Sequence, residues 1–343
     1  MPNQRNGHWS RREFLNGLTV AGTAGFLGLH LSRVGAEPPP ETTMLRLSGR
    51  RRSGVTCQAA MYVAEELLRG EGFTDVQYVE AADTIEAYKA LATGDVDFGM
   101  GFAAPLILHV DAGDSIVFLG GGHIGCFELF GSDRVRALRD LKGKTVAVPG
   151  LGSPQHIYLA TIVTYIGLDP RQDITWVTHP SPEAMRLFSK GTLDAFLGFS
   201  TQALELRAKQ IGHVLVNSMT DRPWSHYFCC MPVGNREFIR QHPNATKRWL
   251  RAFLKASDVC AREPARVAQY LADKGYTKQD EYLLQALQEL PFDKWREYDP
   301  EDTVRFYALR LHEAGMITST PQKIIAEGTD WRFLNELKRE LKG

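Results

Sequence analysis

Two stretches of the chain, residues 86–102 and 183–199, repeat one pattern without a gap. The identical positions are Glu86 and Glu183, Ala87 and Ala184, Gly94 and Gly191, Asp97 and Asp194, Gly101 and Gly198, and Phe102 and Phe199. Each stretch has helical spacing, then a glycine suited to end a helix, then an aspartate before an apolar strand. The repeat predicts two halves of like α/β fold.

The order of the expected elements supports this division. Strands are expected at 44–47, 75–79, 96–100, 115–119, 144–148, 174–177, 195–198 and 214–217. Helices are expected between them at 58–69, 84–93, 105–112, 154–166, 182–189 and 201–210. Regular alternation predicts the α/β class with mainly parallel sheets. From residue 235 onward the pattern is mostly helical, which predicts a helical C-terminal extension.

The N-terminus has the pattern of a twin-arginine export signal. Arg11 and Arg12 follow Ser10, an apolar stretch covers 17–31, and small residues at 34–36 suit signal peptidase. The apolar stretch is too weak for a spanning helix, which needs about 20 strongly apolar residues. We therefore expect residues 1–36 to be a signal peptide handled by the twin-arginine translocase, and 37–43 to be a tether. No cysteine lies near the cleavage site, so a periplasmic protein is expected rather than a lipoprotein.

Charge and cysteine content narrow the function classes. Removal of residues 1–36 leaves 36 basic and 39 acidic side chains, so nothing indicates a nucleic acid as partner. All five cysteines, Cys57, Cys126, Cys229, Cys230 and Cys260, lie after the signal. An oxidising compartment permits a disulfide, but spacing assigns none. Most of them are expected to be buried thiols.

A family resemblance appears at Asp-Leu-Lys-Gly-Lys-Thr-Val-Ala-Val, residues 140–148, and at Leu-x-x-Gly-x-x-Asp, residues 91–97. With Gly152 and Ser153 opening a helix, these motifs resemble ABC transporter substrate-binding proteins of the NMT1/THI5-like family, which includes sulfonate, nitrate and thiamine-precursor receptors. The resemblance covers about residues 44–310. It is specific for the family and poor for the ligand.

The resemblance implies a type II periplasmic binding protein fold with two lobes. Residues 44–126 and 228–343 would form lobe 1 and 127–227 would form lobe 2, and two crossover strands near 126–130 and 226–231 would join the lobes. The expected function is a periplasmic receptor, a monomer without cofactor or catalysis, that delivers a small organic anion to an ABC permease and its ATPase. Sulfonates and carboxylates are favoured, and nitrate-like anions or neutral vitamin precursors remain open.

Residues for a ligand site are expected in loops beyond the carboxyl ends of the strands, where open α/β sheets bind ligands. Ser153 begins a helix, whose free amides favour an anionic group. Arg50 and Arg51 could form a guanidinium fork for a carboxylate or sulfonate. The full predicted set is Arg50, Arg51, Thr56, Phe102, Ala103, His123, Ser153, Gln155, His156, Phe199, Gln202, His226 and Tyr227.

Two alternatives involve a metal or a cofactor. His123 and Cys126, and likewise His226 and Cys229, are three apart and could together form a His₂Cys₂ metal site. The Phe-Cys-Cys segment at 228–230 is faintly similar to a cysteine-rich segment of a pyridoxal-phosphate-dependent pyrimidine synthase of the same fold group. Hydrolase, dinucleotide and phosphate-loop motifs are missing.

Overall fold

The computed structural model describes residues 37–49, 56–277 and 281–342. From Pro39 onward the chain forms one compact unit, which contains every strand and helix of these residues. None of the described helices is both long and apolar enough to cross a membrane.

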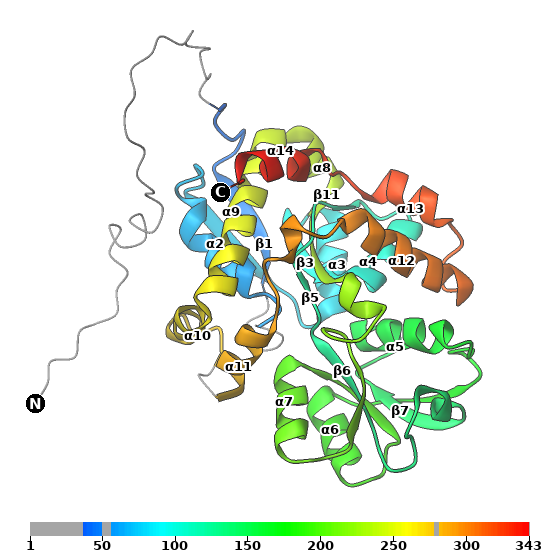
Figure 1. Cartoon of the computed structure of the whole chain (residues 1–343). Helices are drawn as coiled ribbons and strands as arrows, with labels where there is room; N and C mark the ends of the chain where they lie inside the picture. Colours follow the sequence, from blue (N-terminus) through cyan, green and yellow to red (C-terminus); the bar gives the residue numbers. More distant parts are fainter. Residues whose placement is uncertain (1–36, 50–55, 278–280, 343) are drawn as a thin grey trace, which may run out of the picture. The chain divides into compact units, whose positions relative to one another are not determined.

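The strands form two sheets. The first contains β1 (Met44–Gly49), β2 (Asp75–Glu80), β3 (Phe98–Phe102), β4 (Ile116–Phe118), β5 (His123–Ile124) and β11 (Phe228–Asn235). Their order is β2-β1-β3-β11-β4, with β5 also paired to β11. The second contains β6 (Phe127–Gly131), β7 (Lys144–Val148), β8 (Ile174–Thr178), β9 (Ala195–Phe199) and β10 (His213–Asn217), in the order β10-β6-β9-β7-β8. Figure 1 shows β6, β7 and the helices near them in green.

The expectation of mainly parallel sheets was wrong. β1 pairs in parallel with β2 and β3, and β7 with β8 and β9. β11 is antiparallel to β3, β4 and β5, and β6 is antiparallel to β9 and β10. The difference arises because β6 and β11 occupy the segments expected to be crossovers. Both strands are buried along their full length, so they lack the alternation of a half-exposed strand.

Helices follow the strands of both sheets. Those of the first two-thirds of the chain are α2 (Ala59–Leu68), α3 (Thr84–Thr93), α4 (Ala103–Asp111), α5 (Pro154–Tyr165), α6 (Ser181–Ser189) and α7 (Ser200–Ala208). The C-terminal ones are α8 (Arg236–Gln241), α9 (Pro243–Arg262), α10 (Pro264–Asp273), α11 (Glu281–Glu289), α12 (Pro300–Glu313), α13 (Pro321–Gly328) and α14 (Arg332–Glu340). Short 3-10 turns occur at Leu138–Leu141, Trp224–His226 and Lys294–Arg296.

The sequence repeat is also a repeat of structure. α3, β3 and α4 correspond to α6, β9 and α7, with the same spacing between them. Gly94 and Gly191 follow the first helix of each unit at φ of +83° and +74°, a region that glycine adopts without strain. Phe102 and Phe199 each end a strand and directly precede the next helix. The two rings therefore hold equivalent places in the two sheets.

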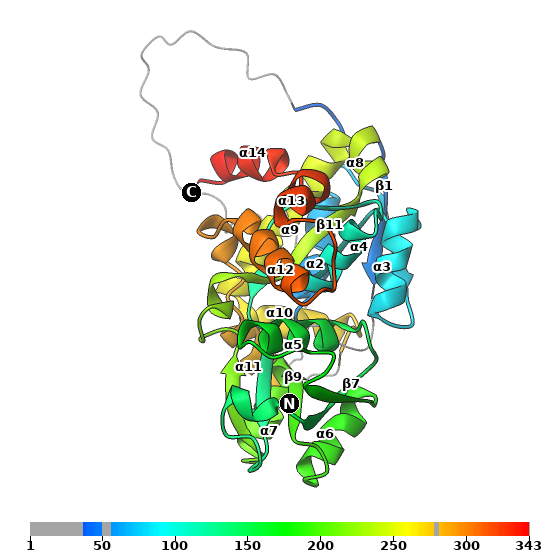
Figure 2. The same ribbon diagram turned by 90° about the vertical axis from the view of Figure 1, so that its right-hand side faces the viewer.

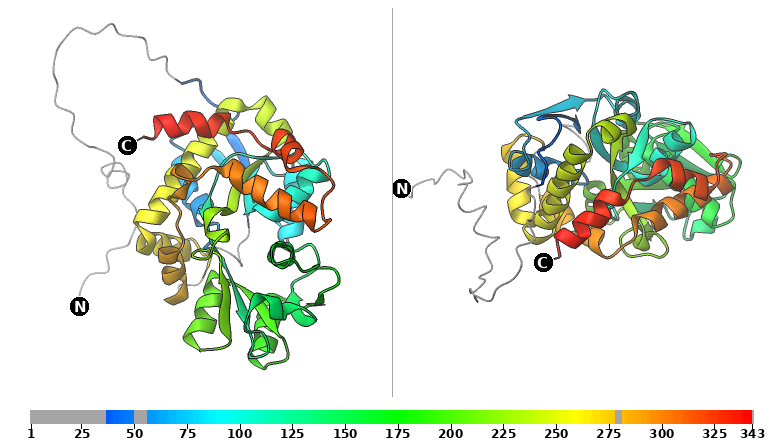
Figure 3. Two further views of the ribbon diagram at one scale, coloured as in Figure 1. Left: turned by 45° about the vertical axis from the view of Figure 1, so that its right-hand side comes forward. Right: turned by 90° about the horizontal axis from the view of Figure 1, so that it is seen from above.

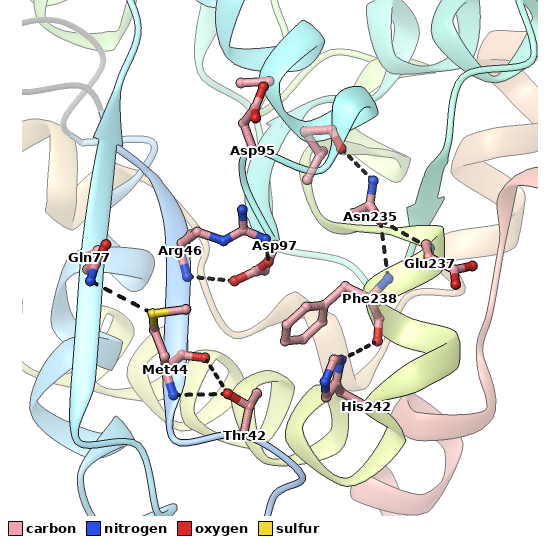
Figure 4. A network of polar contacts seen from close by, with 12 residues as sticks. Thr42, Met44, Arg46, Gln77, Asp95, Asp97, Asn235, Glu237, Phe238 and His242 are labelled. Carbon is pink, nitrogen blue, oxygen red and sulfur yellow. Dashed lines mark hydrogen bonds and ion pairs between the residues drawn. The ribbon is translucent and has the colours of Figure 1, made fainter.

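An aspartate anchors the first sheet at the edge where β3 begins. Asp97 accepts a hydrogen bond from the backbone N–H of Arg46 at 2.7 Å and pairs with its guanidinium at 2.5 Å (Figure 4). Close by, Asn235 caps α8 and donates to the Leu91 carbonyl. These contacts tie together β1, β3, α3 and the end of β11.

The C-terminal helices complete the core of the first sheet and also contact the second half. Trp249 of α9 stacks on Phe98 with ring centroids 4.1 Å apart, and both are fully buried. α9 also packs along α2. α12 contacts α5, and α11 contacts α7 (Figure 2). In the second half, Phe130, Phe188, Phe196 and their neighbours form a separate apolar cluster.

The chain passes twice between the sheets, as the change from cyan to green and from green to yellow-green in Figure 3 illustrates. The first passage is short, because β5 ends at Ile124 and β6 begins at Phe127. The second covers residues 218–227. Ser218 joins the two passages: its Oγ accepts from the backbone N–H groups of Cys126 and Phe127 and donates to the Phe127 carbonyl.

Candidate functional site

A cavity of about 520 Å³ lies where strands of both sheets end. Its walls include the carboxyl ends of β3, β7 and β9 and the start of β6. The lining residues are Thr56, Cys57, Gln58, Asp83, Thr84, Ile85, Tyr88, Met100, Gly101, Phe102, Phe127, Pro149, Gly150, Ser153, Pro154, Gln155, Ser181, Pro182, Phe199, Thr201, Gln202, Cys230, Thr277 and Leu283. A site of this size suits a small organic molecule.

Six helices, α2 to α7, begin at the cavity. The first-turn amides of a helix have no intrahelical partner, and the aligned peptide dipoles give that end a partial positive charge. At α5, for example, Ser153 is the N-cap, with its Oγ accepting from the His156 N–H, and Pro154 is the first helical residue. The convergence of these helix ends makes the cavity electrostatically favourable for an anionic group.

The charged side chains of the described lining are few. Asp83 is the only carboxylate among them, and it is the N-cap of α3, accepting from the Glu86 N–H at 2.9 Å. No lysine, arginine or histidine occurs in that lining. Arg50 and Arg51, predicted as a guanidinium fork, lie outside the described residues. The remaining polar groups of that lining are hydroxyls, amides and the thiols of Cys57 and Cys230.

Apolar rings close the cavity where the two sheets meet. Phe127 contacts Phe102 from the first sheet and Phe199 from the second, with ring centroids 5.3 and 4.8 Å apart. Tyr158 of α5 stacks on Phe127 at 5.0 Å. Tyr88 supports the same floor, because its hydroxyl accepts from the Phe102 N–H at 3.0 Å. A bound molecule would therefore meet aromatic rings together with helix ends, since Phe102 and Phe199 directly precede α4 and α7.

Comparison with known proteins gives the fold and the family. The model of the NMT1/THI5 like family matches residues 56–267. The chain belongs to the NMT1/THI5-like family. No curated protein matches the sequence.

Solved structures similar to this family member share its periplasmic binding protein fold at low sequence identity. The alkanesulfonate-binding protein SsuA from Xanthomonas axonopodis pv. citri, bound to MOPS, has a TM-score of 0.65 and 18% identity over 87% of this chain and 100% of that one. The nitrate-binding protein NrtA from Synechocystis PCC 6803 has a TM-score of 0.66 and 14% identity over 89% and 90%. SsuA from Escherichia coli has a TM-score of 0.63 and 18% identity over 80% and 87%.

In this NMT1/THI5-like chain, some of the residues predicted for the ligand site line the cavity and others do not. The predicted residues that line the cavity are Thr56, Phe102, Ser153, Gln155, Phe199 and Gln202. They come from both sheets. Ala103 is buried directly behind Phe102 as the first residue of α4.

The other predicted residues are held elsewhere by specific contacts. His156 accepts from the Gly152 N–H at 3.1 Å, packs edge-on to Trp176, and has its pKa lowered by burial. Tyr227 stacks on Phe306 with centroids 4.1 Å apart. His226 lies near Tyr298. None of these belongs to the cavity lining.

Thiols form a second feature beside the cavity. The sulfur atoms of Cys126, Cys229 and Cys230 all lie within 4.8 Å of one another, and the three side chains are buried. Cys57 and His123 interact with Cys230 and complete what we call the thiol cluster. All four cysteines are free thiols. The predicted His₂Cys₂ set is therefore only partly present. His226 lies near Tyr298 instead, while Cys57 and Cys230 join His123, Cys126 and Cys229 in the thiol cluster.

The thiols of the cluster differ in acidity. Burial raises the pKa of Cys126 and of Cys229 well above the ordinary thiol value. Hydrogen bonds, first from Cys126 and then from Cys229, hold the pKa of Cys230 well below that value although burial opposes them. Cys230 also lines the cavity, together with Cys57, so the thiol with the lowered pKa is one of two that face the solute space.

Sequence reasoning missed several lining residues. Asp83 directly precedes the helix expected at 84–93 and Thr84 begins it, so their place beyond β2 could have been recognised. Tyr88, Thr277 and Leu283 have no local signal, because the first lies within a helix and the others belong to the C-terminal part that was assigned to no loop of the site.

Proposed function

We propose that this protein is an exported solute-binding receptor that captures a small organic anion and delivers it to an ABC importer. The observation that carries the proposal is that one cavity is lined by residues from both sheets. The first turns of six helices, α2 to α7, also begin at this cavity. Such a site attracts negative charge although no described lining residue is a lysine or arginine, because backbone amides and helix dipoles supply positive potential.

The two-lobed organisation is part of the proposal. Residues 44–126 with 228–343 would form one lobe and 127–227 the other, with the passages at 125–126 and 218–227 acting as the hinge. Closure would bring Phe102 and Phe199 toward a solute from opposite sides. A ligand favours closure only by its additional contacts in the closed form, and the permease would recognise that form.

The proposed setting is the periplasm, reached by the twin-arginine route through the signal at 1–36. The receptor acts as a monomer and performs no chemistry of its own. The family and the solute-binding proteins that share its fold support this role. Sulfonates and carboxylates remain the favoured solutes.

The direct test is to purify the full chain after export and identify any co-purified small molecule by native mass spectrometry. Thermal melting is then measured with ethanesulfonate, benzoate, nitrate and a neutral aminopyrimidine. A solute at a hundredfold excess over its dissociation constant should stabilise the folded state by about 2.7 kcal/mol. Stabilisation by the pyrimidine alone would contradict the anion proposal, and no shift with any small molecule would contradict the receptor proposal.

Matched glutamine variants locate the binding. Gln155 and Gln202 line the cavity, whereas Gln172 is exposed and contacts Asp169. Gln155→Ala and Gln202→Ala should lower solute affinity by about tenfold, the loss of roughly one good hydrogen bond. Gln172→Ala should leave affinity unchanged. Equal affinities in all three variants would place the solute elsewhere.

A further inference from the structure

We propose that the thiol cluster is a binding site for one soft metal ion, Zn²⁺ or Cu⁺, in which Cys126, Cys229 and Cys230 are the sulfur ligands and His123 the nitrogen ligand. Among the described residues this is the one group of three metal-ligating side chains with all ligand atoms mutually close. The proposal goes beyond solute capture and does not depend on it.

The sulfur geometry is near that of a bound ion. The three sulfur atoms lie within 4.8 Å of one another, and the Cys229 and Cys230 sulfurs are 3.9 Å apart. A tetrahedral ion with Zn–S bonds of about 2.3 Å separates its sulfur ligands by about 3.8 Å. The 4.8 Å bound exceeds this separation by about 1 Å, so small side-chain rotations would bring the three sulfurs to coordination distance.

His123 lies outside the mutually close group of three sulfurs, and we assign it as the fourth ligand because it interacts with Cys230. Its Nδ1 lies 3.1 Å from the carbonyl oxygen of Gly125. A carbonyl oxygen only accepts, so Nδ1 carries a proton and Nε2 is the nitrogen left for a metal ion. Nε2 is buried and has no hydrogen-bond partner within the described part of the chain. A histidine whose other nitrogen donates to a backbone carbonyl is the usual arrangement of a metal ligand.

The placement of the cysteines argues against ordinary burial as their whole explanation. Four of the five gather at one point from distant parts of the chain, while Cys260 is buried alone in α9. Cys126 lies on the first passage between the sheets, and Cys229 and Cys230 open the strand that follows the second. An ion bound there joins the two passages.

The chemistry of the donors selects the ion. Thiolate and imidazole ligands favour Zn²⁺ and Cu⁺ over the hard cations Mg²⁺ and Ca²⁺, which prefer oxygen. Cys57 and Cys230 line the cavity, so an ion can enter from there. Cys57 also contacts Cys126 and Cys230 and is the alternative fourth ligand. Zn²⁺ and Cu⁺ are separated by the experiment.

The test uses the full exported chain, reduced with a phosphine and freed of metal with a chelator. Co²⁺ replaces Zn²⁺ as a spectroscopic probe, and Cu⁺ is titrated against a chromophoric competitor. We expect one ion per chain, a thiolate-to-cobalt charge-transfer band in the near ultraviolet, and protection of at least three thiols from a thiol reagent. No such band and no retained Cu⁺ in the folded wild-type chain would overturn the proposal without any variant.

Variants then assign the ligands. Cys126→Ser and Cys230→Ser should each weaken binding by more than the ~10–100-fold that loss of an outer-shell partner costs. His123→Gln should weaken it while the charge-transfer band remains. Cys260→Ser is the matched control, a buried thiol outside the cluster, and should bind as wild type. Equal binding by all four variants, or a Cys126 disulfide with Cys229 or Cys230 in the exported chain, would overturn the site. Solute-dependent melting of the metal-free chain tests the receptor function separately.

Discussion

Asp97 and Asp194 make the same contact in the two sheets: each carboxylate accepts a hydrogen bond from the backbone N–H of the neighbouring parallel strand. The donors are Arg46 in the first sheet, at 2.7 Å, and Thr145 in the second, at 2.8 Å. Each aspartate also pairs with an arginine, Arg46 or Arg134. The identity found in the sequence repeat therefore marks a shared way of joining a strand to its neighbour.

Asp97→Asn should destabilise the protein. Asp97 is almost fully buried, and the amide cannot satisfy both the Arg46 N–H and the guanidinium. A loss of about 1–3 kcal/mol is expected in urea unfolding. Asp95→Asn is the control, because Asp95 is exposed and accepts a hydrogen bond from the nearby Thr93 hydroxyl, so the change should alter stability by less than about 0.5 kcal/mol. Equal losses in the two variants would contradict the role given to Asp97.

Ser153→Ala and Thr320→Ala remove equivalent helix caps, at α5 and at α13. Each should lower the free energy of unfolding by about 1 kcal/mol. Only Ser153 lines the cavity, so only its variant should also lower solute affinity, by a fewfold in calorimetric titration. If the Thr320 variant weakened binding to the same extent, the helix ends at the cavity would have no special part in recognition.

Glu128→Gln should stabilise the protein at neutral pH. Burial raises the pKa of Glu128, and Arg207, 3.5 Å away, only partly opposes this. A raised carboxyl pKa means that the ionised form destabilises the fold above that pKa, and that this penalty disappears as pH falls toward the unfolded value. Tm should exceed that of the wild type by about 1–3 °C at pH 7.

The difference in Tm should narrow as the pH is lowered toward 4.5, the ordinary glutamate value. Glu183→Gln is the control of opposite sign, since its hydrogen bond with Arg186 lowers the pKa of Glu183. A Tm difference for Glu128→Gln that does not vary with pH would show that ionisation of Glu128 is not the cause.

Gly125→Ala should disturb the first passage between the sheets. Gly125 has a φ of +65°, and an added Cβ would lie 1.8 Å from Cγ of Met219. Gly113 also has a positive φ, at +85°, but an added Cβ there would face open space. Gly113→Ala is therefore the control, because it introduces the backbone strain without a steric clash. The Gly125 variant should unfold more easily than the control by roughly 2 kcal/mol. Similar stabilities in urea would mean that Met219 moves aside freely.

Local signals predicted much of the fold. The strand at 144–148, the helix at 84–93 and the Ser153 cap were expected and are present, because each depends on short-range patterns. β6 and β11 match the two crossover strands that the family resemblance implied, but no local pattern identified them. Fully buried strands lack alternation, so their pairing depends on distant partners.

The candidate site was predictable only where it follows strand ends. Phe102 and Phe199 fulfilled that rule. The thiol cluster was not predictable from that rule, because Cys57 comes from a loop that is distant in the sequence from the other cysteines. In addition, a register shift in β11 at Phe228–Cys230 interrupts the alternation that would separate Cys229 from Cys230. No spacing rule reports such a shift.

The repeated unit gives the cavity two similar halves, each with a phenylalanine followed by a helix start. An elongated solute lying across them would meet nearly the same surroundings if turned end for end. Among the described lining residues, only those of the first half add sulfur, through Met100 and the thiols of Cys57 and Cys230. The thiols thus give the cavity a direction, and a solute with unlike ends has one preferred way to lie in it.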